Sequence, residues 1–130
     1  MGMKGTEHAQ EEARAQLDSI GEMVKALEAG EEIDGQDPQE RIYEHPLSVE
    51  VRTGWHCVED RKKATEYNIL LCTGGPAVRI IGELNEYGEP VSAKLEYQDW
   101  FTPWARYGST TEEEEGMLLT YASQFHYFVD

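Results

Sequence analysis

The sequence predicts an α+β fold in which a four-stranded antiparallel meander is flanked by an N-terminal and a C-terminal helix. Apolar residues recur at helical spacing near both ends of the chain. Between them, alternating apolar runs are separated by glycine-marked turns at 73–76 and 86–89. The chain has 130 residues, a length that suits one domain with one core.

The first helix is predicted over residues 7–29, after a disordered start at 1–6. Its apolar residues form one helical stripe, which consists of Ala13, Leu17, Ile20, Val24 and Leu27. Thr6 is a candidate N-cap, and Gly30 stands where a left-handed residue would end the helix. A stripe this narrow also suits a coiled-coil seam. About three heptads are too few for a stable coiled-coil pair on their own, so we expect the helix to dock on the sheet instead.

An acidic linker is predicted over residues 30–46. The Asp37-Pro38 dipeptide indicates a turn, and a short helical turn from Pro38 to Tyr43 is expected after it. The sheet follows over residues 47–98. Its strands are expected at about 47–57, 65–72, 77–84 and 91–98.

Side-chain parity predicts how these strands pair, because a slip of one residue would turn every side chain to the other face. The expected pairs are Ile80 with Leu95, Val78 with Tyr97, Gly82 with Ala93, Leu84 with Val91, Leu71 with Val78, Ile69 with Ile80, Tyr67 with Gly82, Val51 with Leu71, and Trp55 with Tyr67. One face of the sheet is then apolar across all four strands. Gly82 is expected to make room for Tyr67.

The two cysteines are expected to be unbridged. In this register Cys57 lies on the apolar face and Cys72 on the other face, about 20 Å away along the sheet. No disulfide closes such a gap. Cys72 would share its face with a small apolar patch, which a helix covers or a partner contacts. The patch consists of Leu70, Cys72, Ala77 and Ile81.

An aromatic loop is predicted over residues 99–108 and a helix over 109–128. Trp100, Phe101, Trp104 and Tyr107 either cap the end of the core or form an exposed aromatic site for a protein partner. The helix has Thr111 among its candidate N-caps, and glutamates 112–115 suit its positive end. We expect it to pack on the sheet through Leu118, Ala122 and Phe125.

The net charge of −15 disfavours direct binding to nucleic acid or to an anionic membrane. This negative charge either serves solubility alone or forms an acidic face that binds a basic protein surface. The chain has no apolar run long enough to cross a membrane and no secretory-type apolar start, so we expect a cytoplasmic protein.

Catalytic and cofactor signatures are weak, and we expect no cofactor and no metal. His56 and Cys57 are adjacent, but neighbouring strand residues point to opposite faces and cannot form a dyad. No histidine stands at metal-ligand spacing from a cysteine or from another histidine. The loop 73–76 lacks the lysine of a phosphate-binding loop. Asp99 beside Trp100 is the best candidate acid, because an aromatic wall would desolvate it.

Segments 69–84 and 95–104 (ILLCTGGPAVRIIGEL and LEYQDWFTPW) resemble those of small uncharacterised proteins of bacteriophages and integrative elements. The resemblance covers about residues 43–128. It carries no catalytic or binding residue. It implies a small accessory protein that acts on host machinery, and some proteins of that kind inhibit restriction or CRISPR complexes by occupying their DNA-binding surfaces.

The first functional hypothesis is therefore a non-enzymatic acidic module that binds a basic protein surface, with carboxylates spaced like duplex phosphates. Its candidate contact residues are Glu112, Glu113, Glu114, Glu115, Glu28, Glu31, Glu32, Asp34, Asp37, Trp100 and Trp104. The alternatives are a self-associating accessory protein, which would use the patch around Cys72 or the aromatic loop, and a small enzyme that uses His56 or Asp99.

Overall fold

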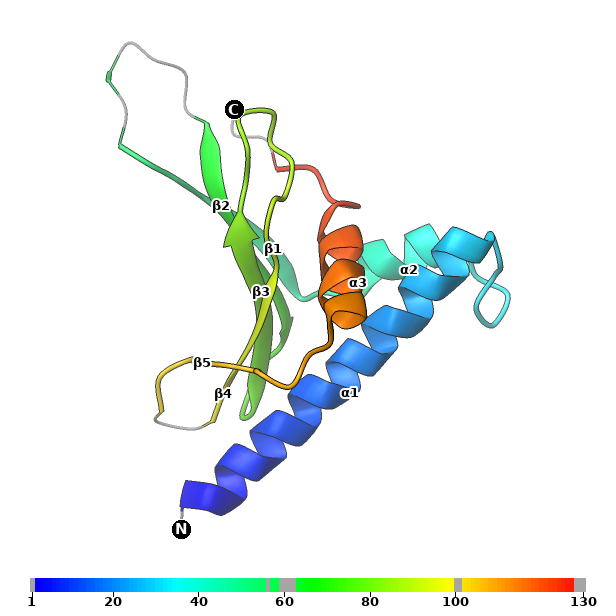
Figure 1. Ribbon diagram of the computed structural model, residues 1–130, viewed down its shortest axis with the longest axis vertical. Coiled ribbons are helices and arrows are strands. Elements are labelled where there is room, and N and C mark those ends of the chain that lie inside the picture. Colours follow the sequence, from blue (N-terminus) through cyan, green and yellow to red (C-terminus); the bar gives the residue numbers. More distant parts are fainter. Residues whose placement is uncertain (1, 56, 59–62, 100–101, 128–130) are drawn as a thin grey trace.

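The computed structural model describes residues 2–55, 57–58, 63–99 and 102–127, with side chains from residue 7 onwards. It is an α+β fold with one antiparallel sheet, whose strands lie side by side in chain order (Figure 1). The elements are α1 (Gly2–Ala29), α2 (Pro38–Glu44), β1 (Ser48–Thr53), β2 (Ala64–Cys72), β3 (Ala77–Glu83), β4 (Lys94–Gln98), β5 (Ala105–Arg106) and α3 (Glu112–Ala122). The predicted architecture is confirmed, with five strands in place of four, because a short β5 pairs with β4.

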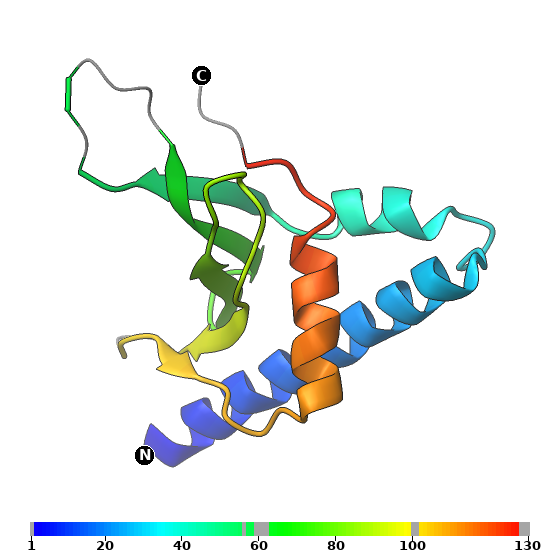
Figure 2. The ribbon, with the colours of Figure 1, turned by 45° about the horizontal axis from the view of Figure 1, so that its top comes forward.

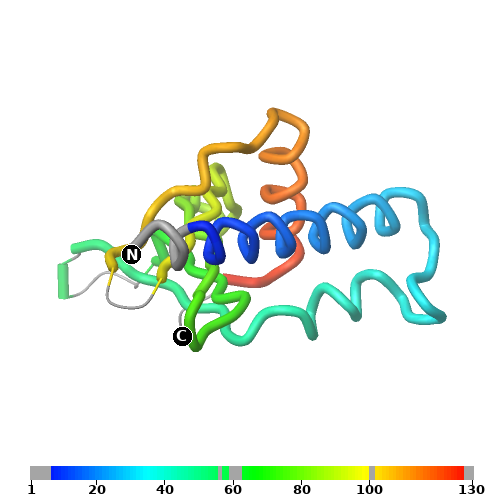
Figure 3. The backbone as a smooth tube through the Cα atoms, turned by 90° about the horizontal axis from the view of Figure 1, so that it is seen from below, coloured from blue at the N-terminus to red at the C-terminus, as the bar shows by residue number. Residues whose placement is uncertain are grey.

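Helix α1 crosses one face of the sheet and packs on β3, β4, α2 and α3 (Figures 2 and 3). The predicted stripe is buried at Ala13, Leu17, Ile20 and Val24, so the helix docks on the sheet as expected. The helix begins earlier than predicted, at Gly2, and residues 2–6 extend it instead of forming a disordered start. This segment has no proline, and each added residue of a formed helix gains one hydrogen bond.

The acidic linker after α1 is held by backbone hydrogen bonds and by a helix cap. Ile33 and Gln36 exchange two backbone hydrogen bonds of 2.9 Å. Asp37 then caps α2 by accepting a hydrogen bond from the Gln39 N–H at 3.2 Å. Ile42 of α2 is fully buried and anchors the segment beneath the sheet.

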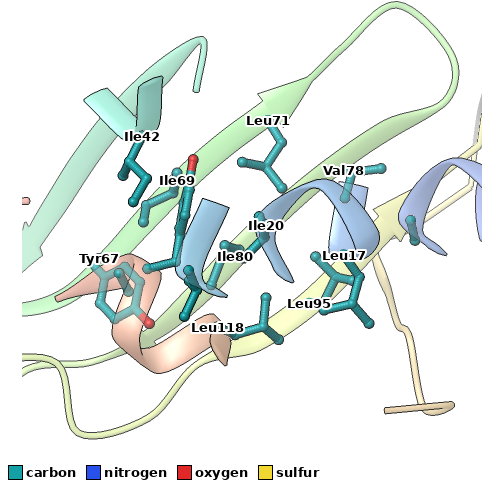
Figure 4. Packing of buried hydrophobic residues seen from close by; sticks show 14 of the residues in the cluster. Leu17, Ile20, Ile42, Tyr67, Ile69, Leu71, Val78, Ile80, Leu95 and Leu118 are labelled. Atoms are coloured by element: carbon teal, nitrogen blue, oxygen red, sulfur yellow. The ribbon is translucent and has the colours of Figure 1, made fainter. Parts of the chain in front are cut away.

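The registers of β2, β3 and β4 are largely as predicted. Ile80 lies opposite Leu95 and opposite Ile69, and Val78 lies opposite Tyr97. Figure 4 shows Ile69, Ile80 and Leu95 on the side of the sheet that Leu17 and Ile20 of α1 cover. The core joins all three helices to one face of the sheet. Its largest fully buried side chains are Tyr121, Leu17, Ile20, Ile42, Ile69, Ile80, Leu95, Leu118, Val24 and Val78.

The predicted register of β1 is wrong. Val51 lies opposite Tyr67 instead of Leu71. The strand ends at Thr53, so Trp55 does not pair with Tyr67 and is fully exposed, and Cys57 is exposed as well. The predicted and observed offsets between β1 and β2 differ by an even number of residues, so Val51 keeps its predicted face of the sheet. Alternation fixes the face of a residue but not its offset when a long loop joins the strands.

Two further boundaries and one residue pairing differ from the prediction. Strand β4 begins at Lys94, and Leu84 bridges Pro90 instead of Val91, which is exposed. Helix α3 ends at Ala122 and not near residue 128. The chain turns back after α3, and the Tyr127 hydroxyl donates a hydrogen bond of 2.6 Å to the Ala122 carbonyl.

Gly82 is confirmed as the place where the sheet accommodates Tyr67. A Cβ atom at Gly82 would lie 2.0 Å from the Ser92 carbonyl oxygen and 2.7 Å from the Tyr67 ring. The Tyr67 hydroxyl donates a hydrogen bond of 2.6 Å to that same carbonyl. The missing side chain therefore permits this partly buried hydrogen bond as well as close packing.

We expect Gly82→Ala to lower the free energy of unfolding by about 3 kcal/mol, because overpacking and loss of the Tyr67 hydrogen bond act together. Urea unfolding followed by circular dichroism measures it. Gly116→Ala is the matched control, since a Cβ there meets no atom within 4 Å and α3 should gain about 1 kcal/mol. Equal effects of the two substitutions would contradict this account.

Candidate interaction surfaces

The predicted acidic contact residues fall into two separate groups. Glu112–Glu115 form the first turn of α3, which lies beside Arg14 in the middle of α1. Glu31, Glu32, Asp34 and Asp37 follow the C-terminal end of α1 (Figure 3). From Arg14 to that end the helix extends roughly 22 Å, at about 1.5 Å per residue. The two groups therefore form no single compact cluster.

Two of the α3 glutamates have structural partners. The Thr111 hydroxyl accepts a hydrogen bond from the Glu114 N–H at 3.1 Å, and the Glu114 carboxylate accepts one from the Thr111 N–H at 3.0 Å. Arg14 contacts Glu114 at 2.6 Å and Asp18 at 2.9 Å. Arg106 lies 3.5 Å from Glu115. These contacts fix the start of α3 against α1.

The Arg14 guanidinium, together with the Thr111 N–H, lowers the pKa of the Glu114 carboxyl. The same contact with Glu114, with a further hydrogen bond to Tyr107, raises the pKa of Arg14. Both shifts stabilise the charged forms, so the pair stays ionised across the neutral range.

Two of the linker acids also have local roles. Asp37 caps α2, and Asp34 lies 3.8 Å from Arg41. Glu28, Glu31 and Glu32 are exposed, as are Glu112 and Glu113, and none of these five has an ion pair within the described part of the chain. Among the predicted contact residues, these five keep their carboxylates available to a partner.

A further row of carboxylates on α1 was missed by the sequence analysis. Glu7, Glu11, Asp18 and Glu22 are exposed, and their spacing places them along one line on the side of α1 away from the core. The polar half of the helical pattern held this signal, since the residues opposite a buried stripe must face water. We define the acidic face as Glu7, Glu11, Asp18 and Glu22 of α1 with Glu112 and Glu113 of α3.

Arginines supply little free positive charge. Each arginine whose side chain the structure describes pairs with a carboxylate, and these are Arg14, Arg41, Arg52, Arg79 and Arg106. The acidic excess is therefore concentrated in carboxylates that lack such partners.

The aromatic loop lies partly on the sheet face that the helices leave open. The Arg79 guanidinium stacks 4.0 Å from the centre of the Trp104 ring and also binds Glu96 at 2.7 Å. Trp104 is half-buried by this stacking and does not cap the helix-covered core. Trp100 and Phe101 lie outside the described residues, so neither interpretation of the whole loop is tested.

The predicted self-association patch is divided between the two faces of the sheet. A β-bulge between Leu70 and Cys72 places Cys72 opposite Val78 and turns its side chain towards Glu12 of α1. Leu70 and Ile81 remain half-buried on the open face. The patch that parity predicted around Cys72 is therefore wrong, because the bulge reverses parity at that one position.

The open face has a shallow cleft of about 370 Å³, lined by Asn68, Arg79, Ile81 and Lys94 among others. The Asn68 Oδ1 atom is buried there and accepts no hydrogen bond from the described residues. Asp99, the candidate acid, is half-buried outside this cleft, and His56 lies outside the described residues. The described residues include no group of three side chains suited to hold a metal ion.

Within the described residues, no helix has the length and apolar character needed to cross a membrane. Comparisons of this chain with protein-family models, with curated proteins and with solved structures find no match.

We expect Glu114→Gln to lower the free energy of unfolding at neutral pH by about 1 kcal/mol, through the capping box and the Arg14 contact. Because the folded pKa of Glu114 is lowered, its contribution exists above the unfolded value of about 4.3 and is lost as the pH falls through the folded pKa.

Urea titrations at neutral and acidic pH should therefore show the two proteins converging as the pH falls below about 4. Glu113→Gln is the control, because Glu113 is exposed and has no ion pair within the described part of the chain. A difference between wild type and Glu114→Gln that stays constant with pH would contradict the assignment.

The position of Cys72 predicts slow thiol chemistry. Burial and the nearby Glu12 carboxylate raise the pKa of the Cys72 thiol. Iodoacetamide at mildly alkaline pH, followed by peptide mass spectrometry, should modify exposed Cys57 well before Cys72. Glu12→Gln should speed the alkylation of Cys72. A Cys72 rate that equals that of Cys57 would place the thiol on the open face.

Proposed function

We propose that this protein is a non-enzymatic binding module whose acidic face docks on a basic protein surface that otherwise binds nucleic acid. The observation that carries the proposal is the row of exposed carboxylates along α1, continued by Glu112 and Glu113 of α3. Exposed charges of one sign along a rigid element favour association with a surface of the opposite sign.

The spacing of these carboxylates supports competition with nucleic acid. Glu7 and Glu11 stand one helical turn apart, as do Asp18 and Glu22. One turn advances about 6 Å along the helix, while phosphates on one strand of a duplex advance about 3.4 Å each along its axis. Within each of these two pairs the carboxylates thus repeat at nearly every second phosphate, and two helical turns separate Glu11 from Asp18. The helix does not need to rearrange to bind.

The resemblance to proteins of bacteriophages and integrative elements suggests the class of partner. We propose host DNA- or RNA-binding defence proteins in the cytoplasm, whose basic grooves this acidic face would occupy. Self-association through the patch around Cys72 loses its basis, because the thiol faces α1. A small enzyme using Asp99 remains the alternative, and no described feature favours it over binding.

The proposal is tested by affinity capture from a bacterial lysate at low and at high salt, with captured proteins then challenged with duplex DNA. Binding should weaken as salt rises, because exposed charges are screened over about 8 Å at physiological ionic strength. Duplex DNA should release the captured protein, since both would compete for the same basic surface. Capture that persists at high salt and resists DNA would contradict the proposal.

A charge-matched pair of variants locates the surface. Glu7→Gln/Glu11→Gln/Glu22→Gln removes three exposed carboxylates of α1, and Glu83→Gln/Glu86→Gln/Glu89→Gln removes three exposed carboxylates at the end of β3 and the turn after it. At roughly 0.5 kcal/mol for each exposed pair, the first variant should lose about tenfold in affinity. The second should retain it to within about twofold. Equal losses would show that net charge alone is responsible.

A further inference from the structure

Strand β1 is an edge of the sheet, and it is the most exposed of the longer strands. None of its six residues is buried, whereas β2, β3 and β4 each bury at least two. Among the described residues, its one sheet neighbour is β2. Its other side therefore presents backbone donors and acceptors that another strand could pair with.

The hydrogen-bond pattern of the sheet shows which groups of β1 point outward. The Leu84 N–H donates to the Thr65 carbonyl at 2.9 Å, so the odd-numbered residues of β2 bond to β3. Since bonding direction alternates along an antiparallel strand, the even-numbered residues of β2 bond to β1. In β1 these are matched by Ser48, Glu50 and Arg52. The N–H and C=O groups of Val49 and Val51 face outward, whereas Thr53 follows a register shift and pairs with even-numbered Ala64 of β2.

The side chains of β1 are sorted by charge as well. Glu50 and Arg52 are exposed on the open face of the sheet, and Arg52 contacts Glu66 at 2.5 Å. Val49 and Val51 alternate with them on the opposite face. Two large apolar side chains flank the strand in exposed positions, Leu47 before it and Trp55 after it. A single strand edge thus combines two opposite charges with exposed apolar residues.

We propose that β1 pairs antiparallel with β1 of a second copy of this chain, around a two-fold axis at Val51. The outward groups of Val51 then bond to the partner's Val51. Glu50 lies opposite the partner's Arg52, and Arg52 lies opposite the partner's Glu50. This interface is isologous, as closed dimers require.

Charge selects this register over its neighbours. The outward groups of Val49 and Val51 can also pair with the axis at Glu50, which places Glu50 opposite the partner's Glu50. An axis at Arg52 places Arg52 opposite the partner's Arg52. Like charges directly opposite are destabilising, and opposite charges are stabilising. Only the axis at Val51 forms two opposite-charge pairs.

The pairing is confined to the strand itself. Leu47 does not continue the outward alternation, because its N–H donates a hydrogen bond of 2.8 Å to the Leu70 carbonyl of β2. The strand ends at Thr53, so the charges of Glu50 and Arg52 select the alignment. The interface lies at the sheet edge away from the acidic face, so this inference is independent of the proposed function.

Sedimentation velocity over a concentration series tests the dimer through its charges. We expect wild type to form a dimer, and Glu50→Arg and Arg52→Glu alone each to weaken it by about tenfold, because each sets two like-charge pairs across the axis. An equimolar mixture of the two variants restores opposite-charge pairs and should recover the dimer. The double variant should recover it too.

Cysteine cross-linking tests the register itself, in a Cys57→Ser background. Val51→Cys should form an intermolecular disulfide on mild oxidation, because paired Cα atoms lie about 5.5 Å apart. Val49→Cys should not, since it lies about 13 Å along the strand from the partner's same residue. A strictly monomeric wild type at millimolar concentration, or equal cross-linking at both positions, would overturn the proposal.

Discussion

The packing of α1 across the apolar face of β2, β3 and β4 is the interaction on which the rest of this structure depends. Ile80 lies between Ile69 and Leu95 in the sheet, and Leu17 and Ile20 of α1 cover them. Helix α3 adds Leu118 and α2 adds Ile42 to the same cluster. Because all three helices bury their apolar residues on one side, the other side of the sheet is left open to solvent.

This one-sided arrangement determines what each surface offers. The outer side of α1 must be polar, and in this chain it is acidic. The open face of the sheet holds ion pairs and the Arg79–Trp104 stack. Helix α1 packs on β3 and β4, whereas no residue of the edge strand β1 is buried. The acidic face and the β1 edge are therefore consequences of the same core.

The acidic residues divide into those that build the fold and those that remain available. Glu114 and Asp37 cap helices, and Glu114 also ties α3 to α1 through Arg14. Their charges are compensated by backbone donors or by arginine, and their replacement would cost stability. Glu7, Glu11 and Glu22 have no such partners among the described residues. A binding function has to draw on this second set.

The sequence by itself determined the fold class, the stripe of α1, the pairing of β3 with β4 and the room that Gly82 provides for Tyr67. Each follows from a local period or from a short turn that leaves little freedom of register. Tertiary structure alone decided the offset of β1 against β2. Side-chain alternation fixes the face of each residue, but the long loop between the two strands leaves their offset open. Tertiary structure also decided the bulge that turns Cys72 inward. It also placed α3 beside the middle of α1, a crossing that no local sequence pattern encodes. This crossing separates Glu112–Glu115 from the linker acids and brings these glutamates next to the carboxylates of α1.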